Sequence, residues 1–468
     1  MSNPKTDQAV SAAIELIKVH DVISVWWDYY RYNNGIWELI NHKADIDSTI
    51  YNLYLKKSFP IPATTQIMET KNMLGVLTFG EYGKNIRAMS DDLNRIWKIN
   101  TLTGIYNIEK NIFKNHEKHD LVFYSLPFDI IQDETERKEY IQKNMGGFKS
   151  FLWSTFIDEE FDSKWNPLIE KEEWEMKKLM MFVQEWMGYS FMAFNPLEKA
   201  LIMVWEWRNG KWTLNEIWKS ILWRHNYTTL SIEELNDPCF LWLSKNKLAN
   251  FSDDMNSNTQ LDTWVIKGSA SNEEVSSNRK FKDQDRFYFT SKTIMACNEL
   301  PYLKKVWPAV KERFQILTFN NIFTSDKGNL KVNLKQQLKL EAEAIFNWAF
   351  EWLIRLYQNQ CFTIPKCIVN DVNSYLDSYD MVGLWLKEEE DLMFGSDFIG
   401  SPKKMYQMFS DFAFKSGKQS FAKPRFYKRM NTLGYKRKKI NWYEYFYWIK
   451  VKWEDEIVKA WLKSDLLT

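Results

Sequence analysis

A glycine and a lysine, Gly210 and Lys211, lie in the stretch "VWEWRNGKWTLNEI" at residues 204–217 with the spacing of a phosphate-binding loop. In such a loop the backbone N–H groups point at phosphates, the lysine reaches the β/γ-phosphates and a following hydroxyl binds Mg²⁺. The lysine is therefore expected to face solvent and to pack against nothing. The candidate phosphate-binding residues, three of them tryptophans where small residues are expected, are Trp205, Trp207, Asn209, Gly210, Lys211, Trp212 and Thr213.

A pair of carboxylates, Asp253 and Asp254, follows about forty residues later, at the end of the apolar segment 247–254. An ATPase holds Mg²⁺ through one such carboxylate and polarises the attacking water through the next. An acidic turn after a strand would explain the pair equally well if the pair stood alone. The predicted metal ligands are Asp253 and the hydroxyl of Thr213.

Two further polar residues continue the same order along the chain. Asn298 follows the apolar run "TIMAC", where an amide could position water or sense a γ-phosphate. Arg313 precedes the run "FQILTF", where it could complete the site of a neighbouring subunit. Together the order and spacing predict a site for ATP hydrolysis with four catalytic residues, Asp253, Asp254, Asn298 and Arg313.

The loop needs a strand before it and a helix after it, and the flanking residues predict that context. The apolar run 199–205 suits a buried strand, and residues 213–223 have the i, i+3, i+4 apolar spacing of an amphipathic helix. A β-hairpin is predicted where Asn33, Asn34 and Gly35 separate two aromatic runs. Further strands are predicted at 247–254, 286–299 (two with a turn) and 314–319, and further helices at 166–195, 334–357 and around the acidic residues 388–391.

Length and composition indicate a globular chain of two or three domains, because 468 residues with 45% hydrophobic residues can form sizeable cores. The 62 Lys and Arg against 61 Asp and Glu leave a net charge of +1, so affinity for nucleic acid must come from local patches. The absence of a long apolar run and of a signal-peptide pattern favours a cytoplasmic protein. Four scattered cysteines favour reduced thiols over disulfides or a zinc site.

Charge is unevenly distributed near the C-terminus. Residues 411–440 hold ten Lys and Arg, with Asp411 as the single acidic residue. This block is a candidate DNA face, because clustered cations bind the phosphate backbone. Pro365 follows the predicted helix 334–357 and places a domain boundary near residue 365. The predicted DNA contacts in the block are Lys436, Arg437, Lys438 and Lys439.

The segment "KLANFSDDMNSNTQLDTWVIKGSASNEEVSSNRKFKDQDRFYFTSKTIMACNELP", residues 247–301, resembles the superfamily-3 helicase domain of phage, plasmid and poxvirus-type primase-helicases. The resemblance implies an AAA+-like P-loop ATPase of α/β fold that uses ATP and Mg²⁺ and forms a ring, usually a hexamer, around DNA. It implies a Walker A lysine, two Walker B acids, a sensor asparagine and an arginine finger at Lys211, Asp253, Asp254, Asn298 and Arg313. The basic turn 278–284 falls where the family carries its pore hairpin, so Arg279, Lys280 and Lys282 would contact DNA phosphates.

Outside this segment the resemblance is weaker. Residues 90–135 look like part of the domain that precedes the helicase core, and residues 370–455 look like the winged-helix module that follows it. The expected domains are a pre-helicase domain (1–165), an AAA+-like ATPase domain (166–365) and a winged-helix-like DNA-binding domain (366–468). The family's N-terminal primase domain finds no room here, so we expect a helicase without priming activity that works with a separate primase or polymerase.

The leading interpretation is an ATP-dependent replicative DNA helicase of a phage or plasmid, acting as a homo-hexamer on single-stranded or forked DNA and not at a membrane. Two other functions stay open. A replication-initiation module could bind DNA with impaired or no ATP hydrolysis if the loop tryptophans are genuine. A DNA-packaging ATPase would share the loop but predicts a nuclease domain, for which the sequence shows no clustered acidic signature.

Glycine is scarce and tryptophan abundant. The chain has 23 tryptophans and 16 glycines, the latter about half of the usual roughly 7%. Glycines in phosphate-binding loops allow positive φ and close approach of the backbone to phosphate, which an indole forbids. A genetic code in which UGA encodes glycine, translated with a table in which UGA encodes tryptophan, explains both numbers. Trp37 and Trp348, where an aromatic suits the family, are then genuine, and the candidate glycine positions are Trp205, Trp207, Trp212, Trp223, Trp352, Trp442 and Trp448.

Overall fold

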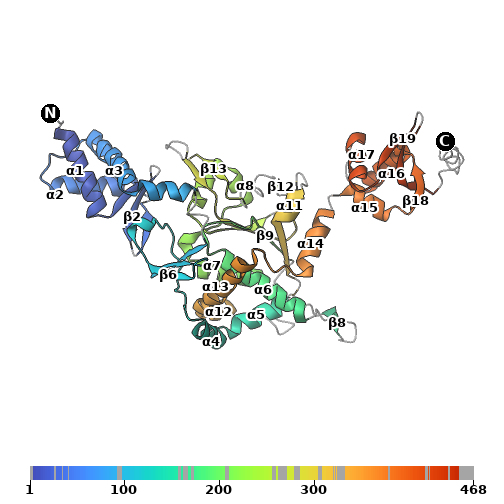
Figure 1. Cartoon of the computed structure of the whole chain (residues 1–468), viewed down its shortest axis with the longest axis horizontal. Helices are drawn as coiled ribbons and strands as arrows, with labels where there is room; N and C mark the ends of the chain where they lie inside the picture. Colours follow the sequence, from blue (N-terminus) through green and yellow to red (C-terminus); the bar gives the residue numbers. More distant parts are fainter. Residues whose placement is uncertain are drawn as a thin grey trace. The chain divides into compact units, whose positions relative to one another are not determined.

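The computed structural model describes residues 4–25, 28–33, 35–40, 42–91, 97–156, 160–161, 167–169, 173–205, 210–255, 260–261, 271–278, 285–303, 308–319, 321, 323, 333–377, 380–416, 420, 422–440 and 443–452. The chain divides into two compact units, Met1–Asp371 and Val372–Thr468, whose order along the chain can be followed by colour in Figure 1. None of the described helices is both long and apolar enough to cross a lipid bilayer.

The first unit begins with three helices and an antiparallel three-stranded sheet, with the bounds α1 (Pro4–Lys18), β1 (Val22–Val25), β2 (Asp28–Asn33), β3 (Ile36–Leu39), α2 (Lys43–Lys56) and α3 (Thr64–Asp91). The predicted hairpin is confirmed, because Asn33 pairs with Ile36 and Gly35 has a φ of +89°. These elements enclose their own hydrophobic core. A buried ion pair of 3.0 Å between Lys245 Nζ and Asp28 Oδ2 ties this region to the rest of the unit.

Residues 97–169 form a second antiparallel sheet, two helices and a short strand pair. The elements are β4 (Lys98–Asn100), β5 (Gly104–Asn107), β6 (Ile112–Asn115), the 3₁₀ turn η2 (Lys118–Asp120), α4 (Glu134–Asn144), α5 (Gly146–Phe156), β7 (Glu160–Phe161) and β8 (Pro167–Ile169). Ile99 and Phe148 from this stretch share one hydrophobic core with Leu201 and Phe251 further along the chain. The sequence predicted helix across 167–169, and the structure has a strand there.

The centre of the first unit is a parallel five-stranded sheet in the order β10-β11-β15-β9-β17. Its strands are β9 (Ala200–Trp205), β10 (Tyr227–Thr228), β11 (Ala249–Met255), β15 (Lys292–Cys297) and β17 (Phe314–Phe319). The predicted strands at 199–205, 247–254 and 314–319, and the pair within 286–299, are confirmed. A mixed α/β fold with a parallel sheet is compatible with a P-loop-like core.

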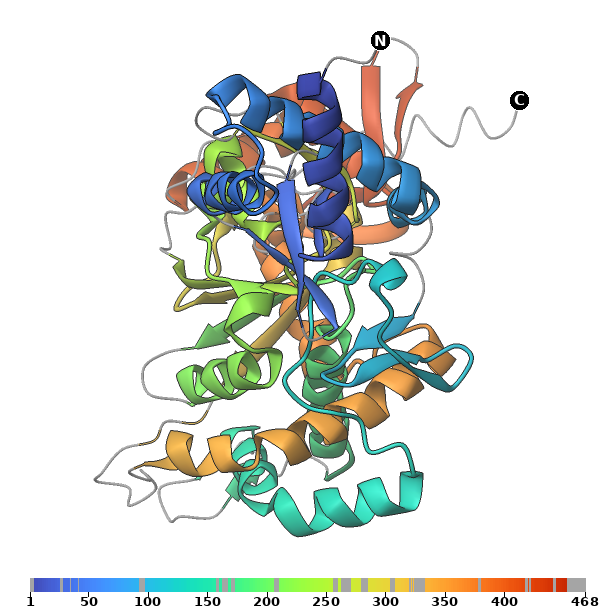
Figure 2. The same cartoon turned by 90° about the vertical axis from the view of Figure 1, so that its left-hand side faces the viewer.

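Six further helices belong to this part of the chain, and five of them contribute residues to the hydrophobic core that the sheet shares. They are α6 (Glu173–Tyr189), α7 (Lys211–Leu222), α11 (Pro308–Arg313), α12 (Leu334–Leu340), α13 (Ala342–Asn359) and α14 (Lys366–Asp377). In Figure 2, α12 and α13, in orange, lie beside the teal helices α4 and α5, and α13 also packs against α6 and α7. Smaller elements are β12 (Gln260–Leu261), β13 (Glu274–Ser277), β14 (Asp285–Tyr288), β16 (Tyr302–Leu303), the helices α8 (Ile232–Asn236) and α9 (Pro238–Leu241), and the 3₁₀ turns η3 (Arg224–Asn226) and η4 (Trp242–Ser244).

The single helix predicted at 334–357 is two helices, and Glu341 stands at the break between them with φ −89° and ψ 3°. Its carboxylate accepts hydrogen bonds from the backbone N–H groups of Gly147 (3.0 Å) and Phe148 (2.8 Å). These N–H groups lie in the first turn of α5 and have no partner within their own helix. Glu341 therefore caps a distant helix, which explains why local periodicity did not reveal the break.

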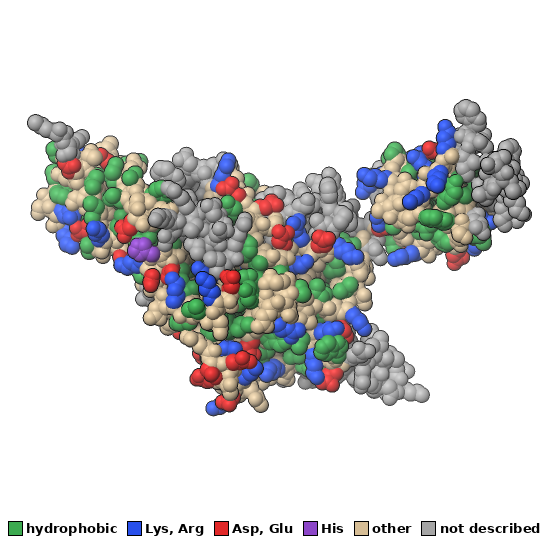
Figure 3. Space-filling model, viewed as in Figure 1, with side chains coloured by type: hydrophobic (Ala, Val, Ile, Leu, Met, Phe, Trp, Pro, Cys, Tyr) green, Lys and Arg blue, Asp and Glu red, His purple; other side chains and the backbone are tan. Residues whose placement is uncertain are grey.

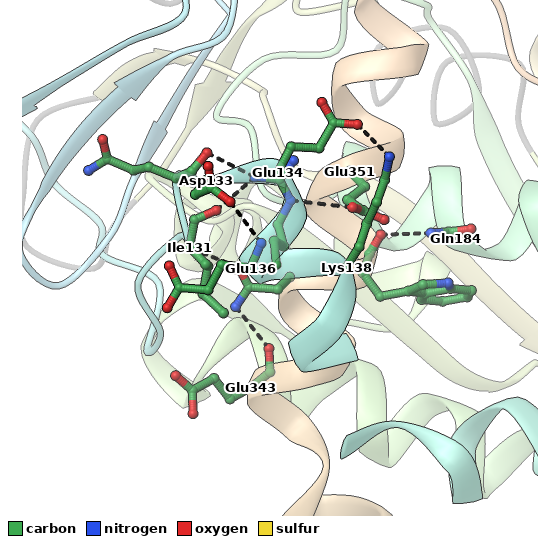
Figure 4. A network of polar contacts seen from close by, with 12 residues as sticks. Ile131, Asp133, Glu134, Glu136, Lys138, Gln184, Glu343 and Glu351 are labelled. Carbon is green, nitrogen blue, oxygen red and sulfur yellow. Dashed lines mark hydrogen bonds and ion pairs between the residues drawn. The ribbon is translucent and has the colours of Figure 1, made fainter. Parts of the chain in front are cut away.

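A polar network joins α4 to α13 (Figure 4). Asp133 caps α4 by accepting from Glu136 N–H at 2.8 Å. Arg137 is 5% exposed, donates to the carbonyl of Ile131 at 2.7 Å and lies 3.5 Å from Glu351. Burial raises the pKa of the Glu351 carboxyl, and the charge of Arg137 opposes that shift. The network holds α4 against α13, and both helices contribute to the same hydrophobic core.

The second unit contains α15 (Met381–Glu388), β18 (Leu392–Gly400), α16 (Pro402–Lys415), α17 (Lys423–Thr432), β19 (Arg437–Ile440) and β20 (Tyr443–Val451). Its antiparallel sheet has the order β18-β20-β19, and Trp385, Phe409, Phe426 and Phe446 lie in its core. The helix predicted around 388–391 ends at Glu388, because the chain turns there into β18.

Candidate functional site

Three of the predicted site residues, Lys211, Asp253 and Asn298, lie at one edge of the parallel sheet. The strands β9, β11 and β15 are parallel, and in register Cys297 pairs with both Val204 and Met255. Asn298 directly follows β15, Asp253 lies near the end of β11, and the loop that leads to Lys211 follows β9. Ligands of open α/β sheets bind outside the carboxyl ends of the strands, so this edge has the placement that such a site needs.

The helix that follows the loop begins without a side-chain cap. Gly210 stands at its N-cap with φ +88° and ψ −8°, and this residue has no side chain that could cap the first turn of α7. Free N–H groups at a helix N-terminus attract anions. A Cβ at position 210 would lie 3.1 Å from Phe151 and 3.3 Å from Thr155, both in α5. Helix α5 thus packs closely against Gly210, and the positive φ of this residue also favours glycine.

Lys211 is the first residue of α7 and is 1% exposed. The expectation of a solvent-facing lysine that packs against nothing is wrong. The side chain is buried, and its Nζ lies 4.3 Å from the ring centroid of Trp212. Burial raises the pKa of the Cys297 thiol to about 12, and the nearby charge of Lys211 opposes this shift. The ammonium therefore lies close to the end of β15.

Two residues of α7 hold Asp253, and neither of them was among the predicted site residues. Asn215 Nδ2 donates to Asp253 Oδ1 at 3.0 Å, and Lys219 Nζ forms an ion pair with Asp253 Oδ2 at 2.8 Å. Asn215 is 1% exposed, and its Oδ1 accepts no hydrogen bond from the described residues. The positions 211, 215 and 219 repeat every four residues, which places them on one face of a helix. This spacing is the signal that could have revealed them.

Arg313 lies at the opposite edge of the sheet. It ends α11, directly before the amino end of β17, and its Nη2 lies 2.8 Å from Glu198 Oε2, just before β9. Because β9 and β17 are parallel, this pair is separated from Lys211 by the length of the strands. Within one chain the structure brings Lys211, Asp253 and Asn298 to one edge and leaves Arg313 at the other.

The remaining predicted ligands are only partly described. Thr213 is half-buried in the first turn of α7, and Trp212 beside it is 42% exposed. Trp205 and Asp254 belong to β9 and β11, while Trp207 and Asn209 lie outside the described residues. In the described part of the chain, no group of three or more His, Cys, Asp and Glu could hold a metal ion. Mg²⁺ commonly needs only one or two protein ligands beside substrate phosphates, a set that Asp253 and Thr213 could supply.

The structure describes the two strands at the base of the expected pore hairpin. β13 and β14 pair antiparallel from Glu274↔Tyr288 to Ser277↔Asp285. Arg279, Lys280 and Lys282, predicted at its tip, lie outside the described residues.

The cations of the second unit lie on its surface, where Figure 3 shows Lys and Arg side chains gathered. Lys436, Lys438 and Lys439 are exposed along β19 and the turn before it. Arg437 differs, because it forms an ion pair of 2.9 Å with Glu444 and lies 4.6 Å from the ring centroid of Tyr427. Helix α17 adds further exposed cations that were not among the predicted contacts, namely Lys423, Arg425 and Lys428.

One family model matches part of the chain. Residues 205–313 match a family of unknown function, DUF5906, over less than a quarter of the chain. This segment contains Lys211, Asp253, Asn298 and Arg313. No curated protein sequence matches the chain. The expected membership of the superfamily-3 helicases stays a prediction.

Similar solved structures include apo structures of the NrS-1 C terminal region. Two of them have a TM-score of 0.47 at 11% identity and cover 94% of this chain and 98% of their own. A third has a TM-score of 0.45, also at 11% identity, and covers 94% of this chain and 99% of its own. TM-scores of this size are too low to establish a common fold.

Proposed function

We propose that the chain is an ATP-dependent DNA helicase of a phage or plasmid, with the carboxyl edge of the parallel sheet as its ATPase site. One observation carries the proposal: the helix that begins with the buried Lys211 also holds Asp253 through Asn215 and Lys219. A phosphate lysine and a metal carboxylate are thereby fixed to the same rigid element. P-loop ATPases need the lysine and the metal carboxylate at fixed positions, because the lysine and the metal bind the same phosphates.

The groups of the chain would act as follows. The first turn of α7 and Lys211 would bind phosphate oxygens, and the hydroxyl of Thr213 and the carboxylate of Asp253 would hold Mg²⁺. Asp254 polarises the attacking water and Asn298 orients it. Bound ATP with Mg²⁺ supplies the phosphoryl group that is transferred to water. The buried position of Lys211 excludes solvent from the charge that faces the phosphates, which strengthens that interaction.

The position of Arg313 supports an assembly of several subunits. Its place at the far edge of the sheet fits a residue that serves the site of the next subunit in a homo-hexamer, as an arginine finger supplied in trans. The β13–β14 hairpin would carry Arg279, Lys280 and Lys282 towards DNA. The second unit has the order helix, strand, two helices and two strands, which fits a winged helix that presents α17 and β19 to DNA.

One observation favours a second function. Trp212 lies over Lys211, with 4.3 Å from Nζ to the ring centroid, where a nucleotide-binding loop has a small residue. If this indole is native, it competes with phosphate for the ammonium, and the chain would be a replication-initiation module that binds DNA without hydrolysing ATP. A DNA-packaging ATPase has no comparable observation in its favour.

ATP turnover with and without single-stranded DNA tests the proposal, together with displacement of a strand from a forked duplex. We expect turnover that rises with single-stranded DNA and unwinding that requires ATP. DNA binding without turnover would support the initiation module. Turnover without unwinding on any fork would contradict the helicase assignment.

A further inference from the structure

Trp223 has a backbone conformation that tryptophan avoids. It is the C-cap of α7, with φ 71° and ψ 148°, and its indole is 45% exposed. Residues other than glycine rarely have a positive φ, and the combination with ψ near 150° approaches a region that is essentially restricted to glycine. Glycine is common beside helix C-termini, because it adopts positive φ without the steric cost of a Cβ. The backbone at position 223 therefore has the geometry of a glycine.

Trp448 shows the same conflict inside a strand. It lies in β20 with φ 66°, and its indole is 46% exposed. Its neighbours Tyr447 and Ile449 pair with Ile399 and Phe394, so the register of β18 shifts by several residues opposite Trp448. The extra residues of this irregularity, 395–398, belong to β18 and already include Gly395, so the conflict at Trp448 is its own positive φ. Among non-glycine residues of the described ranges, Trp223 and Trp448 have the two largest positive φ values.

Other tryptophans have environments that only an indole fills. Four of them are almost completely buried and donate their Nε1–H to an acceptor. These bonds join Trp37 to Lys118 O (2.9 Å), Trp186 to Gln315 Oε1 (2.5 Å), Trp218 to Ser190 Oγ (2.8 Å) and Trp385 to Glu389 Oε2 (3.2 Å). Buried indoles usually have such a partner. The tryptophans thus include one group whose side chains are buried and hydrogen-bonded, and a second group, Trp223 and Trp448, whose backbone conformation suits glycine.

We propose that residues 223 and 448 are glycines in the native protein, encoded by UGA in a genetic code that reads this codon as glycine. The scarcity of glycine and the excess of tryptophan across the chain follow from the same cause. At Trp223 and Trp448 the inference rests on backbone conformation alone and does not depend on the ATPase assignment. Trp352, by contrast, lies within helical α13 with its ring 4.2 Å from Arg355 Cζ, so the backbone gives no argument at that position.

The inference extends to the loop through the proposed function. With glycine at 205, 207 and 212 the loop reads Gly-Glu-Gly-Arg-Asn-Gly-Lys-Gly-Thr, a sequence whose backbone can approach phosphates closely. Glycine at 212 also removes the ring that lies over Lys211 and leaves the ammonium to the phosphates. The native chain would then bind ATP more tightly than the chain with indoles.

The codons of the gene and the masses of peptides from the natural source test the inference directly. We expect UGA at 223 and 448, UGG at 37, 186, 218 and 385, and peptides that carry the mass of glycine at the first two positions. UGG at 223 or 448 would overturn the inference there. UGA spread evenly over buried and exposed tryptophans, with the mass of tryptophan throughout, would overturn it as a whole.

Variants of the recombinant protein provide an independent test. Trp223→Gly should raise Tm by about 2–4 °C, since it relieves a strained conformation. Trp218→Gly, a few residues earlier in the same helix, should lower Tm by more than this because it empties a packed site. A lower Tm for Trp223→Gly would count against the inference.

Equilibrium binding of a fluorescent ATP analogue then separates the two proposals. The triple variant with glycine at 205, 207 and 212 should bind at least tenfold more tightly than the chain with tryptophan. If the codons at these positions are UGA and the variant still does not bind, the genetic-code inference stands and the ATPase assignment fails. If the codons are UGG and the chain with tryptophan binds equally well, the inference fails and the ATPase assignment stands.

Discussion

The two units use lysine and arginine in opposite ways. At the carboxyl edge of the parallel sheet, Lys211 is 1% exposed and Lys219 is held by Asp253. On the second unit, Lys436, Lys438 and Lys439 project into solvent from a short strand and the turn before it. A buried cation acts on one position with little screening by salt, whereas exposed cations act together as a field that salt weakens. The first arrangement suits chemistry at one phosphate and the second suits a polymer of phosphates.

Removing the buried cation should have the largest effect. Lys211→Met keeps most of the buried stem and deletes the charge, so we expect ATP hydrolysis to fall below detection while the fold is retained. Circular dichroism and turnover assays on the same preparation measure both. Normal turnover by this variant would remove Lys211 from the phosphate site. The matched control is Lys339→Met, which deletes an exposed lysine that lies 3.5 Å from Glu216 of α7.

Arg313 lies between the two cases, since its side chain is 19% exposed and pairs with Glu198. Arg313→Ala should lower turnover by a factor on the order of 10³–10⁵ if the residue acts as an arginine finger. Mixing this variant with Lys211→Met protein should restore part of the activity, because some interfaces then combine two intact halves. Glu198→Gln breaks the same ion pair and keeps the arginine. An equal loss in that control would show that the pair only supports the fold.

The exposed cations should affect DNA affinity and its dependence on salt. Replacing Lys436, Arg437, Lys438 and Lys439 with glutamine should weaken binding to any sequence and reduce the salt slope by about one unit for each DNA phosphate that is no longer neutralised. Fluorescence anisotropy across a salt series measures the slope. Because Arg437 is already paired with Glu444, its single substitution should change the slope less than that of Lys438. A slope that stays constant in the quadruple variant would exclude this strip from the DNA interface.

The smallest expected effect concerns stability. Lys219→Met leaves Asp253 partly buried without its ion-pair partner, and should lower the free energy of unfolding by about 1–3 kcal/mol. The exposed pair of Lys339 and Glu216 should contribute less than about 1 kcal/mol. Urea unfolding of Lys219→Met and Lys339→Met compares a buried with an exposed pair. Equal losses of unfolding free energy in the two variants would mean that the Lys219–Asp253 pair is screened by solvent as much as the exposed pair is.

The sequence predicted the strands of the parallel sheet well because they are short apolar runs with polar residues at both ends. The strand 314–319 was predicted with its observed bounds, and Asn298 was placed correctly after β15. Strand order and the burial of Lys211 could not be predicted in this way, because both depend on how distant segments pack. The break at Glu341 was missed for the same reason, since its cause is the N-terminus of α5.

The candidate site was predicted in part. The spacing of known motifs pointed to Lys211, Asp253 and Asn298, which the fold brings to one edge of the sheet. Asn215 and Lys219 belong to no familiar motif, and their role follows from a contact between α7 and β11 that joins residues 34 and 38 positions apart. Helical periodicity could have placed them on the face of Lys211, but only the contact with β11 shows which acid that face meets.

The close packing of α5 against Gly210 affects how the protein can be shortened. A fragment that begins at residue 166 would contain every motif residue and would still lack Phe151 and Thr155, the side chains of α5 that lie beside Gly210. It would also expose apolar surface that residues 97–156 cover in the intact unit. A truncated protein for crystallisation or drug screening should therefore start upstream of residue 97, because a fragment chosen by motif alone would precipitate or bind nucleotide poorly for reasons unrelated to catalysis.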